Sequence, residues 1–185
     1  MRDFVLLYVN GRQYQLRGSE VFWSLADFLR RKLRLTGTKV VCSEGDCGTC
    51  TVLCGKLVDG QVQYQTLLAC IRFVYQLDGC HIVTVEGIES HGNLTAVQES
   101  MVRCHGSQCG FCTPGFVLAI TGILEREPPI SSTAWRDGLT GNLCRCTGYA
   151  PILEAAEELK QAAHERLGDL YPDRDMVQNI GAHTT

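Results

Sequence analysis

The pattern of hydrophobic and polar positions changes period near the middle of the chain. Before about residue 90, short apolar runs alternate with turn residues, which is typical of β-strands mixed with a helix. After it, apolar residues recur at three- and four-residue intervals, as they do on helices. The pattern predicts an α+β fold with two domains, residues 1–90 and 91–168. Residues 169–185 lack an apolar pattern and are expected to form a loose tail or a partner-binding arm.

The first half is predicted to open with a β-hairpin. Residues 4–9 and 13–17 have strand character, and both residues of Asn10-Gly11 between them tolerate positive φ. Ser24 suits the start of a helix whose carbonyl end carries the basic residues 30–32. Further strands are expected at residues 51–54, 61–67 and 81–85, with turns at Gly55, Asp59-Gly60 and Asp78-Gly79.

The second half is predicted to be helical after a linker at residues 91–93. Helices are expected over residues 94–104, from Pro114 to a point before Pro128, after a capping Ser132, and from Pro151 to Gly168. Four helices of this length suggest a compact bundle.

Charge and hydropathy exclude several functional classes. The 185 residues include 17 basic and 20 acidic ones, and a net charge of -3 gives no field that attracts nucleic acid. The N-terminus does not have the layout of a secretory signal peptide. The uncharged apolar stretch at residues 111–124 is shorter than the roughly 18 residues of a membrane span. We therefore expect a cytoplasmic chain with no membrane span and no nucleic-acid partner.

Cysteine usage points to metal chemistry. The chain has 11 cysteines, and an odd count in a reducing compartment disfavours a disulfide framework. The first set has the C-x4-C-x2-C spacing of plant-type ferredoxins followed by a distant fourth cysteine. The second set has C-x2-C and C-x-C pairs. The two candidate ligand sets are Cys42, Cys47, Cys50 and Cys70, and Cys109, Cys112, Cys144 and Cys146.

Two chemistries compete for these thiols, a structural zinc site and a 2Fe-2S cluster. Paired short spacings, as in the second set, are common in zinc sites. The spacing of the first set favours a 2Fe-2S cluster, which needs hydrogen-bond donors around its sulfurs. Gly45 and Gly48 let the backbone curl and turn its N-H groups toward them.

Three motifs resemble the iron-sulfur subunit of the xanthine dehydrogenase family of molybdenum hydroxylases. They are CSEGDCGTCTV at 42–52, QCGFCTPGF at 108–116 and GNLCRCTGYAPI at 141–152. The second and third look closest to those of purine-oxidising members, although related motifs occur in enzymes acting on aldehydes, carbon monoxide, N-heterocycles and aromatic thioesters. The resemblance covers residues 5–159. It implies a ferredoxin-like β-grasp domain followed by a four-helix domain, with one 2Fe-2S cluster in each.

The resemblance also implies a role and partners. The first cysteine set would hold the cluster nearer FAD, and the second set the cluster nearer a molybdenum-pterin cofactor, which Gln108 and Cys146 would approach. The chain would be the electron-transfer subunit of a multi-subunit oxidoreductase. Because fused family members continue into a flavin domain and this sequence stops, FAD is expected on a medium subunit and molybdenum on a large one.

Several residues depart from the family pattern or stand outside it. Val41 replaces a usual glycine and Thr49 a common alanine, which we expect to alter loop packing or reduction potential.

No residue suggests acid-base or nucleophilic catalysis, so no catalytic residue is assigned. Arg145 is either a charge that tunes the cluster or a solvated surface residue. The remaining cysteines, expected to pack as small apolar residues, are Cys54, Cys80 and Cys104. The alternatives are a stand-alone two-cluster ferredoxin and a structural zinc module.

Overall fold

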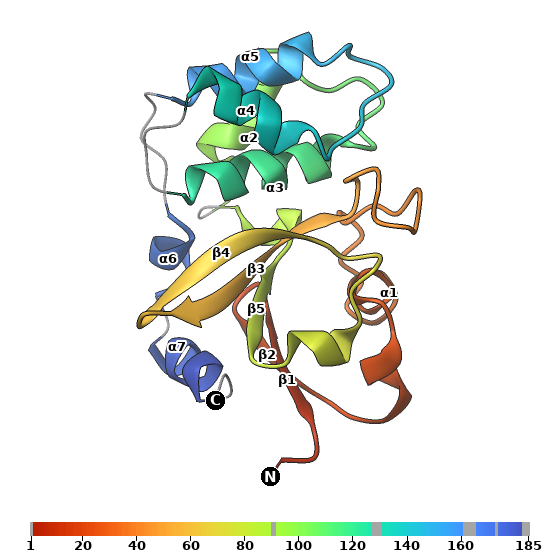
Figure 1. The fold of residues 1–185 in the computed structure, drawn as a ribbon, viewed down its shortest axis with the longest axis vertical. Coiled ribbons are helices and arrows are strands. Elements are labelled where there is room, and N and C mark those ends of the chain that lie inside the picture. Colours follow the sequence, from red (N-terminus) through yellow and green to blue (C-terminus); the bar gives the residue numbers. More distant parts are fainter. Residues whose placement is uncertain (1, 90–91, 127–130, 161–165, 173, 183–185) are drawn as a thin grey trace.

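The computed structural model describes residues 2–89, 92–126, 131–160, 166–172 and 174–182 (Figure 1). A mixed five-stranded sheet has the order β2-β1-β5-β3-β4, in which β1 pairs parallel with β5 and every other pairing is antiparallel. The strands are β1 (Val5–Val9), β2 (Arg12–Leu16), β3 (Thr51–Val58), β4 (Gln61–Leu68) and β5 (Cys80–Val83).

The expected turns are confirmed at two hairpins and wrong at one glycine. Asn10 and Gly11 take φ values of 48° and 76° between β1 and β2, and Asp59 and Gly60 take 50° and 80° between β3 and β4. Gly55, expected to be a turn, lies inside β3. A Cβ there would lie 2.7 Å from the Tyr64 side chain, so this glycine allows close packing within a strand.

The predicted first helix forms and widens after one turn. Ser24 Oγ accepts the backbone N-H of Asp27 at 3.1 Å and caps α1 (Leu25–Asp27). The chain continues as the π-helix η2 (Phe28–Lys32), where the N-H of Leu33 reaches the carbonyl of Phe28. Three 3-10 turns complete this half: η1 (Gly18–Phe22), η3 (Val74–Leu77) and η4 (Val85–Gly87).

The second half is helical and packs directly on the sheet. Helix α3 contacts both β3 and β4, and in Figure 1 it lies between the sheet and helices α2, α4 and α5. One hydrophobic core joins Leu53 and Val83 of the sheet with Phe116 and Ile120 of α3 and the fully buried Trp135. The helices of this half are α2 (Ala96–Arg103), α3 (Thr113–Leu124), α4 (Ser132–Leu139) and α5 (Ala150–Glu158).

Helix boundaries differ from expectation at two places. Helix α4 is capped by Ser131, whose Oγ accepts the N-H of Ala134, and not by Ser132. Helix α5 ends at Glu158, and Gly168, the expected helix end, lies inside α6 (Leu167–Leu170). The expected linker is described only from Gly92, at φ 83°, and Pro128 lies outside the described residues.

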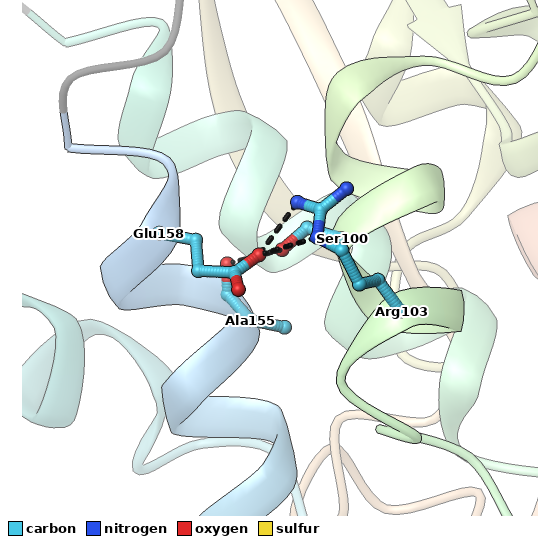
Figure 2. A network of polar contacts seen from close by, with 4 residues as sticks. All are labelled: Ser100, Arg103, Ala155 and Glu158. Carbon is cyan, nitrogen blue, oxygen red and sulfur yellow. Dashed lines mark hydrogen bonds and ion pairs between the residues drawn. The ribbon is translucent and has the colours of Figure 1, made fainter.

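A polar network joins α2 to α5 (Figure 2). Ser100 is fully buried, and its hydroxyl contacts the carbonyl of Ala155 and a Glu158 carboxylate oxygen, each at 2.9 Å. Arg103 donates two hydrogen bonds to the same carboxylate oxygen. The network holds the helix before the Cys109 loop against the helix that follows the Cys146 loop.

The described part of the C-terminal segment packs against the sheet and is not a loose tail, whereas the alternative expectation of a partner-binding arm stays a prediction. Met176 and Ile180 of α7 (Arg174–Gly181) are buried against Leu6 and Tyr8 of β1. Tyr171 donates a hydrogen bond from its hydroxyl to the carbonyl of Gly87. Asn179 of the same helix donates a hydrogen bond from its side-chain amide to the Tyr8 hydroxyl at 3.0 Å, so apolar and polar contacts together hold α7 on the sheet.

Candidate metal centres

The loop of residues 42–50 directs backbone N-H groups at its first thiol. Ser43, Gly45 and Gly48 all take positive φ, between 61° and 82°, and so curl the chain around Cys42. Backbone N-H groups of Glu44, Cys47 and Asp46 lower the pKa of Cys42 to about 6. The loop is therefore built to stabilise an anionic sulfur.

The second thiol pair of this set is brought together by the β3-β4 ladder. Cys50 precedes β3 and Cys70 follows β4, and the N-H of Ala69 donates to the carbonyl of Cys50 at 3.2 Å. Burial raises the pKa of Cys50 to about 12, and its side chain contacts that of Cys70. Cys42 likewise contacts Cys47, so the first set consists of two thiol pairs.

The second set has the same paired arrangement at one end of the helical half. Cys112 contacts Cys144, and Cys109 contacts Cys146, through their side chains. Burial raises the pKa of Cys112 to about 12. Burial is the largest single influence on Cys144 and acts to raise its pKa, but hydrogen bonds from Thr147, Cys146 and Cys112 together outweigh it, so the pKa of this thiol is lowered.

The donor set fits a 2Fe-2S cluster at each site. Such a cluster takes four cysteine thiolates, two on each iron, and each site supplies four thiols as two contacting pairs. Backbone N-H groups at the Cys42 thiol supply the hydrogen bonds that an anionic cluster requires. Within the described residues, no three His, Cys, Asp or Glu side chains are close enough to hold a single metal ion.

Hydrogen bonds join the two sites directly. The backbone N-H of Leu143, next to Cys144, donates to the carbonyl of Cys47 at 3.0 Å. The side-chain amide of Asn142 donates to the carbonyl of Gly48 at 2.9 Å. Ligand candidates of different sets are therefore connected through one backbone hydrogen bond.

Three polar side chains contact candidate ligands in the structure, and these contacts were not predicted from the sequence. Thr49 Oγ1 lies 3.0 Å from the sulfur of Cys47, and Thr147 Oγ1 lies 3.1 Å from that of Cys144. Tyr149, at φ 69°, accepts the backbone N-H of Cys144 on its hydroxyl at 3.0 Å. A sequence signal was available for the two threonines, because each follows the cysteine that it contacts by two or three positions, as in C-G-T and C-R-C-T.

The remaining predicted site residues lie at the surface. Gln108 is exposed beside the exposed thiol of Cys109, and Cys146 and Arg145 are exposed on the neighbouring loop. Val41, before the first loop, is 61% exposed. The second cysteine set thus has one face open to solvent.

Cysteines outside the two sets have the expected packing or a partner. Cys54 and Cys80 are buried in the core between α1 and the sheet, as predicted. They contact each other, which raises the pKa of Cys54 and lowers that of Cys80. Cys104 is half-buried and contacts Glu158, and burial together with this carboxylate raises its pKa.

Comparison with known proteins identifies both halves. A family model for the 2Fe-2S iron-sulfur cluster binding domain matches residues 7–75, and one for a second 2Fe-2S binding domain matches residues 84–157. In the described part of the chain no helix has the length and apolar character to cross a membrane.

Similar sequences occur in two kinds of oxidoreductase. The chain is 43% identical over 156 residues to aldehyde oxidase from Homo sapiens. It is 41% identical over 157 residues to xanthine dehydrogenase from Emericella nidulans. These matches cover 83% and 84% of the chain but only 12% and 11% of the relatives, so the chain spans about an eighth of their length.

Solved structures show the same fold. A chain of quinoline 2-oxidoreductase from Pseudomonas putida 86 is 33% identical with a TM-score of 0.69, and the match covers 98% of both chains. Aldehyde oxidoreductase from Desulfovibrio desulfuricans ATCC 27774 is 32% identical with a TM-score of 0.73, covering 97% of this chain and 18% of that one. With its two 2Fe-2S binding domains, the chain belongs to the aldehyde oxidase and xanthine dehydrogenase family of molybdenum hydroxylases, corresponding to their iron-sulfur region.

Proposed function

We propose that this chain is an electron-transfer unit that passes single electrons between a molybdenum-pterin centre and FAD. In this proposal Cys42, Cys47, Cys50 and Cys70 ligate one 2Fe-2S cluster, and Cys109, Cys112, Cys144 and Cys146 ligate the other. A β-grasp ferredoxin domain, residues 1–90, carries the first, and a four-helix domain, residues 91–168, carries the second. Each cluster accepts and releases one electron, and the protein holds the thiolates and supplies their hydrogen-bond donors.

The hydrogen bond between the two cysteine loops is the observation that carries the proposal. From Cys47 to Cys144 the connection runs through one carbonyl, the N-H of Leu143 and the intervening backbone, with an N-O distance of 3.0 Å. A short connection of this kind favours electron transfer between two redox groups, because it brings their ligand loops into direct contact. A protein that used its cysteines only as structural zinc sites would have no need to join them.

Exposure differs at the two sites in a way that supports the assignment of a partner to each. Cys109 and Cys146 are exposed, and Gln108 lies beside them at the surface. This open face suits direct contact with a pterin carried by a partner, with Gln108 and Cys146 as the contact residues. The first set, in which Cys47 and Cys50 are buried, would then exchange electrons with FAD.

Apolar side chains surround both cysteine loops at the surface and suit docking onto partners. Around the first set they are Phe22, Val41, Ile71, Phe73 and Tyr75, and around the second they are Phe111, Leu143 and Tyr149. Phe22 and Phe73 each pack against the Tyr75 ring. We assign these two surfaces to a medium FAD-binding partner and a large molybdenum-binding partner, in the cytoplasm.

Purification of the native complex through a tag on this chain tests the proposal. We expect molybdenum and flavin to co-purify with it, together with about four iron atoms and as much acid-labile sulfide per chain. A monomer that carries only iron and sulfide would identify a free two-cluster carrier instead. Zinc without iron or sulfide would contradict electron transfer altogether.

A further inference from the structure

We propose that Asn142 is a positioning residue that fixes the contact between the two cysteine loops, an inference that rests on the proposed electron-transfer function. Asn142 is 6% exposed, although its neighbours Gly141 and Leu143 are both exposed. The amide nitrogen donates to the carbonyl of Gly48 at 2.9 Å and approaches Thr51 Oγ1 at 3.4 Å. Because both neighbours present oxygen atoms, the amide nitrogen faces them.

The contact is a tight junction of three segments. A Cβ on Gly48 would collide with the carbonyl of Gly141 and would lie 2.7 Å from the Asn142 amide. A Cβ on Gly115, three residues after Cys112, would lie 2.5 Å from the carbonyl of Gly48 and 3.2 Å from the same amide. Three of the segments that carry candidate ligands therefore approach one another at Gly48, and Asn142 is the side chain inserted there.

Asn142 and its neighbour act on consecutive carbonyls of the first loop. Asn142 holds the carbonyl of Gly48, while Leu143 donates its backbone N-H to the carbonyl of Cys47. The N-H of Asn142 itself donates to the carbonyl of Leu139 at 3.0 Å, which anchors the residue to the end of α4. This two-point attachment sets the distance between the loops.

The Gly48 carbonyl accepts hydrogen bonds from other donors as well. Loss of the Asn142 amide can therefore change how the two loops are positioned without unfolding the first loop. Thr51 donates to it from its backbone N-H at 3.1 Å and from its hydroxyl at 2.7 Å. Loss of the Asn142 amide therefore leaves the first loop with its own hydrogen bonds and the carbonyl satisfied. The side-chain connection between the two loops is lost. The hydrogen bond from the Leu143 N-H to the Cys47 carbonyl then opens more often, because the neighbouring residue no longer holds the loops together.

The test compares Asn142→Ala with Thr51→Val in the full-length chain carrying both clusters. Both variants remove one side-chain donor from the Gly48 carbonyl, and Thr51→Val also removes the more distant acceptor of the Asn142 amide, at 3.4 Å. Only Asn142→Ala removes the donor that reaches this carbonyl from the other loop. Two readouts are used: hydrogen exchange of the peptide that contains Leu143, and the magnetic coupling between the two reduced clusters in EPR spectra.

We expect Asn142→Ala to retain both cluster signals, to weaken their coupling and to speed exchange at Leu143 by about tenfold, the factor that one buried hydrogen bond represents in an opening equilibrium. Thr51→Val should keep the wild-type coupling and exchange. Asn142→Ser, too short to reach Gly48, replaces the alanine variant if that loses its clusters.

Wild-type coupling and exchange in the Asn142 variant would overturn the inference while leaving the proposed function intact. The same changes in Thr51→Val would also overturn it, because the effect would then belong to the carbonyl and not to the inter-loop donor. Absence of two cluster signals in the wild-type chain would instead overturn the proposed function itself.

Discussion

Hydroxyl groups beside candidate ligands give this chain a means of adjusting each site separately. Thr49 lies 3.0 Å from the sulfur of Cys47, at a position where alanine is common in the resembling family. A hydroxyl that donates to a ligand sulfur stabilises the more negative, reduced state of a cluster. The departure from the family pattern thus has a physical consequence at this site.

Replacing Thr49 by alanine is expected to lower the reduction potential of the first cluster. One hydrogen bond of about 1 kcal/mol that favours the reduced state corresponds to about 40 mV for one electron. Redox titration followed by EPR measures the shift, with Thr51→Val as the control because its hydroxyl donates to the Gly48 carbonyl and not to a sulfur. An unchanged or raised potential in Thr49→Ala would contradict this role.

His81 is a second residue whose environment has a measurable consequence. Its ring is fully buried in β5, with Nε2 accepting the N-H of Gly11 at 3.0 Å and Nδ1 lying 2.7 Å from the hydroxyl of Tyr64. Burial lowers the pKa of His81 to about 4. The folded chain therefore holds this imidazole neutral where the unfolded chain, with a pKa near 6.5, would protonate it.

Stability is therefore expected to fall as the pH falls from about 6.5 to about 4. Above this range His81 is neutral in both the folded and the unfolded chain, so it adds no pH dependence to the free energy of unfolding. Within the range only the unfolded chain takes up the proton, which favours unfolding. The full loss is about 3 kcal/mol for a pKa difference of this size. Chemical denaturation of wild-type and His81→Gln chains measures it, and a difference between the two that is independent of pH would contradict the assignment.

At the scale of elements, the close approach of α3 to the sheet depends on Gly122. A Cβ at this position would lie 2.8 Å from Thr66 and 2.9 Å from Leu53. Alanine gains about 1 kcal/mol in helix propensity but costs about 1–3 kcal/mol in overpacking, so the net expectation is a loss of about 1 kcal/mol. The midpoint of chemical denaturation checks it.

The matched control is Gly168→Ala in α6, where a Cβ would meet no atom within 4 Å. It should leave stability unchanged or slightly raised. If Gly122→Ala were as stable as Gly168→Ala, the close approach of α3 to the sheet would not depend on the absence of a side chain at Gly122.

Local sequence signals predicted the elements that depend on local chemistry. Asn10-Gly11 and Asp59-Gly60 form the expected turns, and Ser24 caps the expected helix. Gly55 and Gly168 were misassigned because a glycine signals a turn, a helix end and a close contact alike, and only the neighbouring chain decides among them. The docking of Met176 and Ile180 was missed because two apolar residues are too few to indicate a packed helix by themselves.

At the scale of the whole molecule, the two halves form one body with a shared core. Residues from β3 and β5 pack in the same apolar cluster as those of α3, α4 and α5. The C-x4-C-x2-C spacing indicated the first set of cysteines, whereas the resemblance to a known family implied the grouping of the second set. Neither signal predicted the bond between Leu143 and Cys47, since contacts between two sites 96 positions apart in the sequence leave no periodic signal.

The central claim is that eight cysteines hold two separate 2Fe-2S clusters, and EPR of the reduced chain tests it most directly. We predict two distinguishable rhombic signals that integrate to about two spins per chain, because the two ligand environments differ in burial and hydrogen bonding. Cys70→Ser should remove or alter only one signal, and Cys112→Ser only the other. A single signal of one spin per chain, or loss of the same signal in both variants, would contradict the assignment.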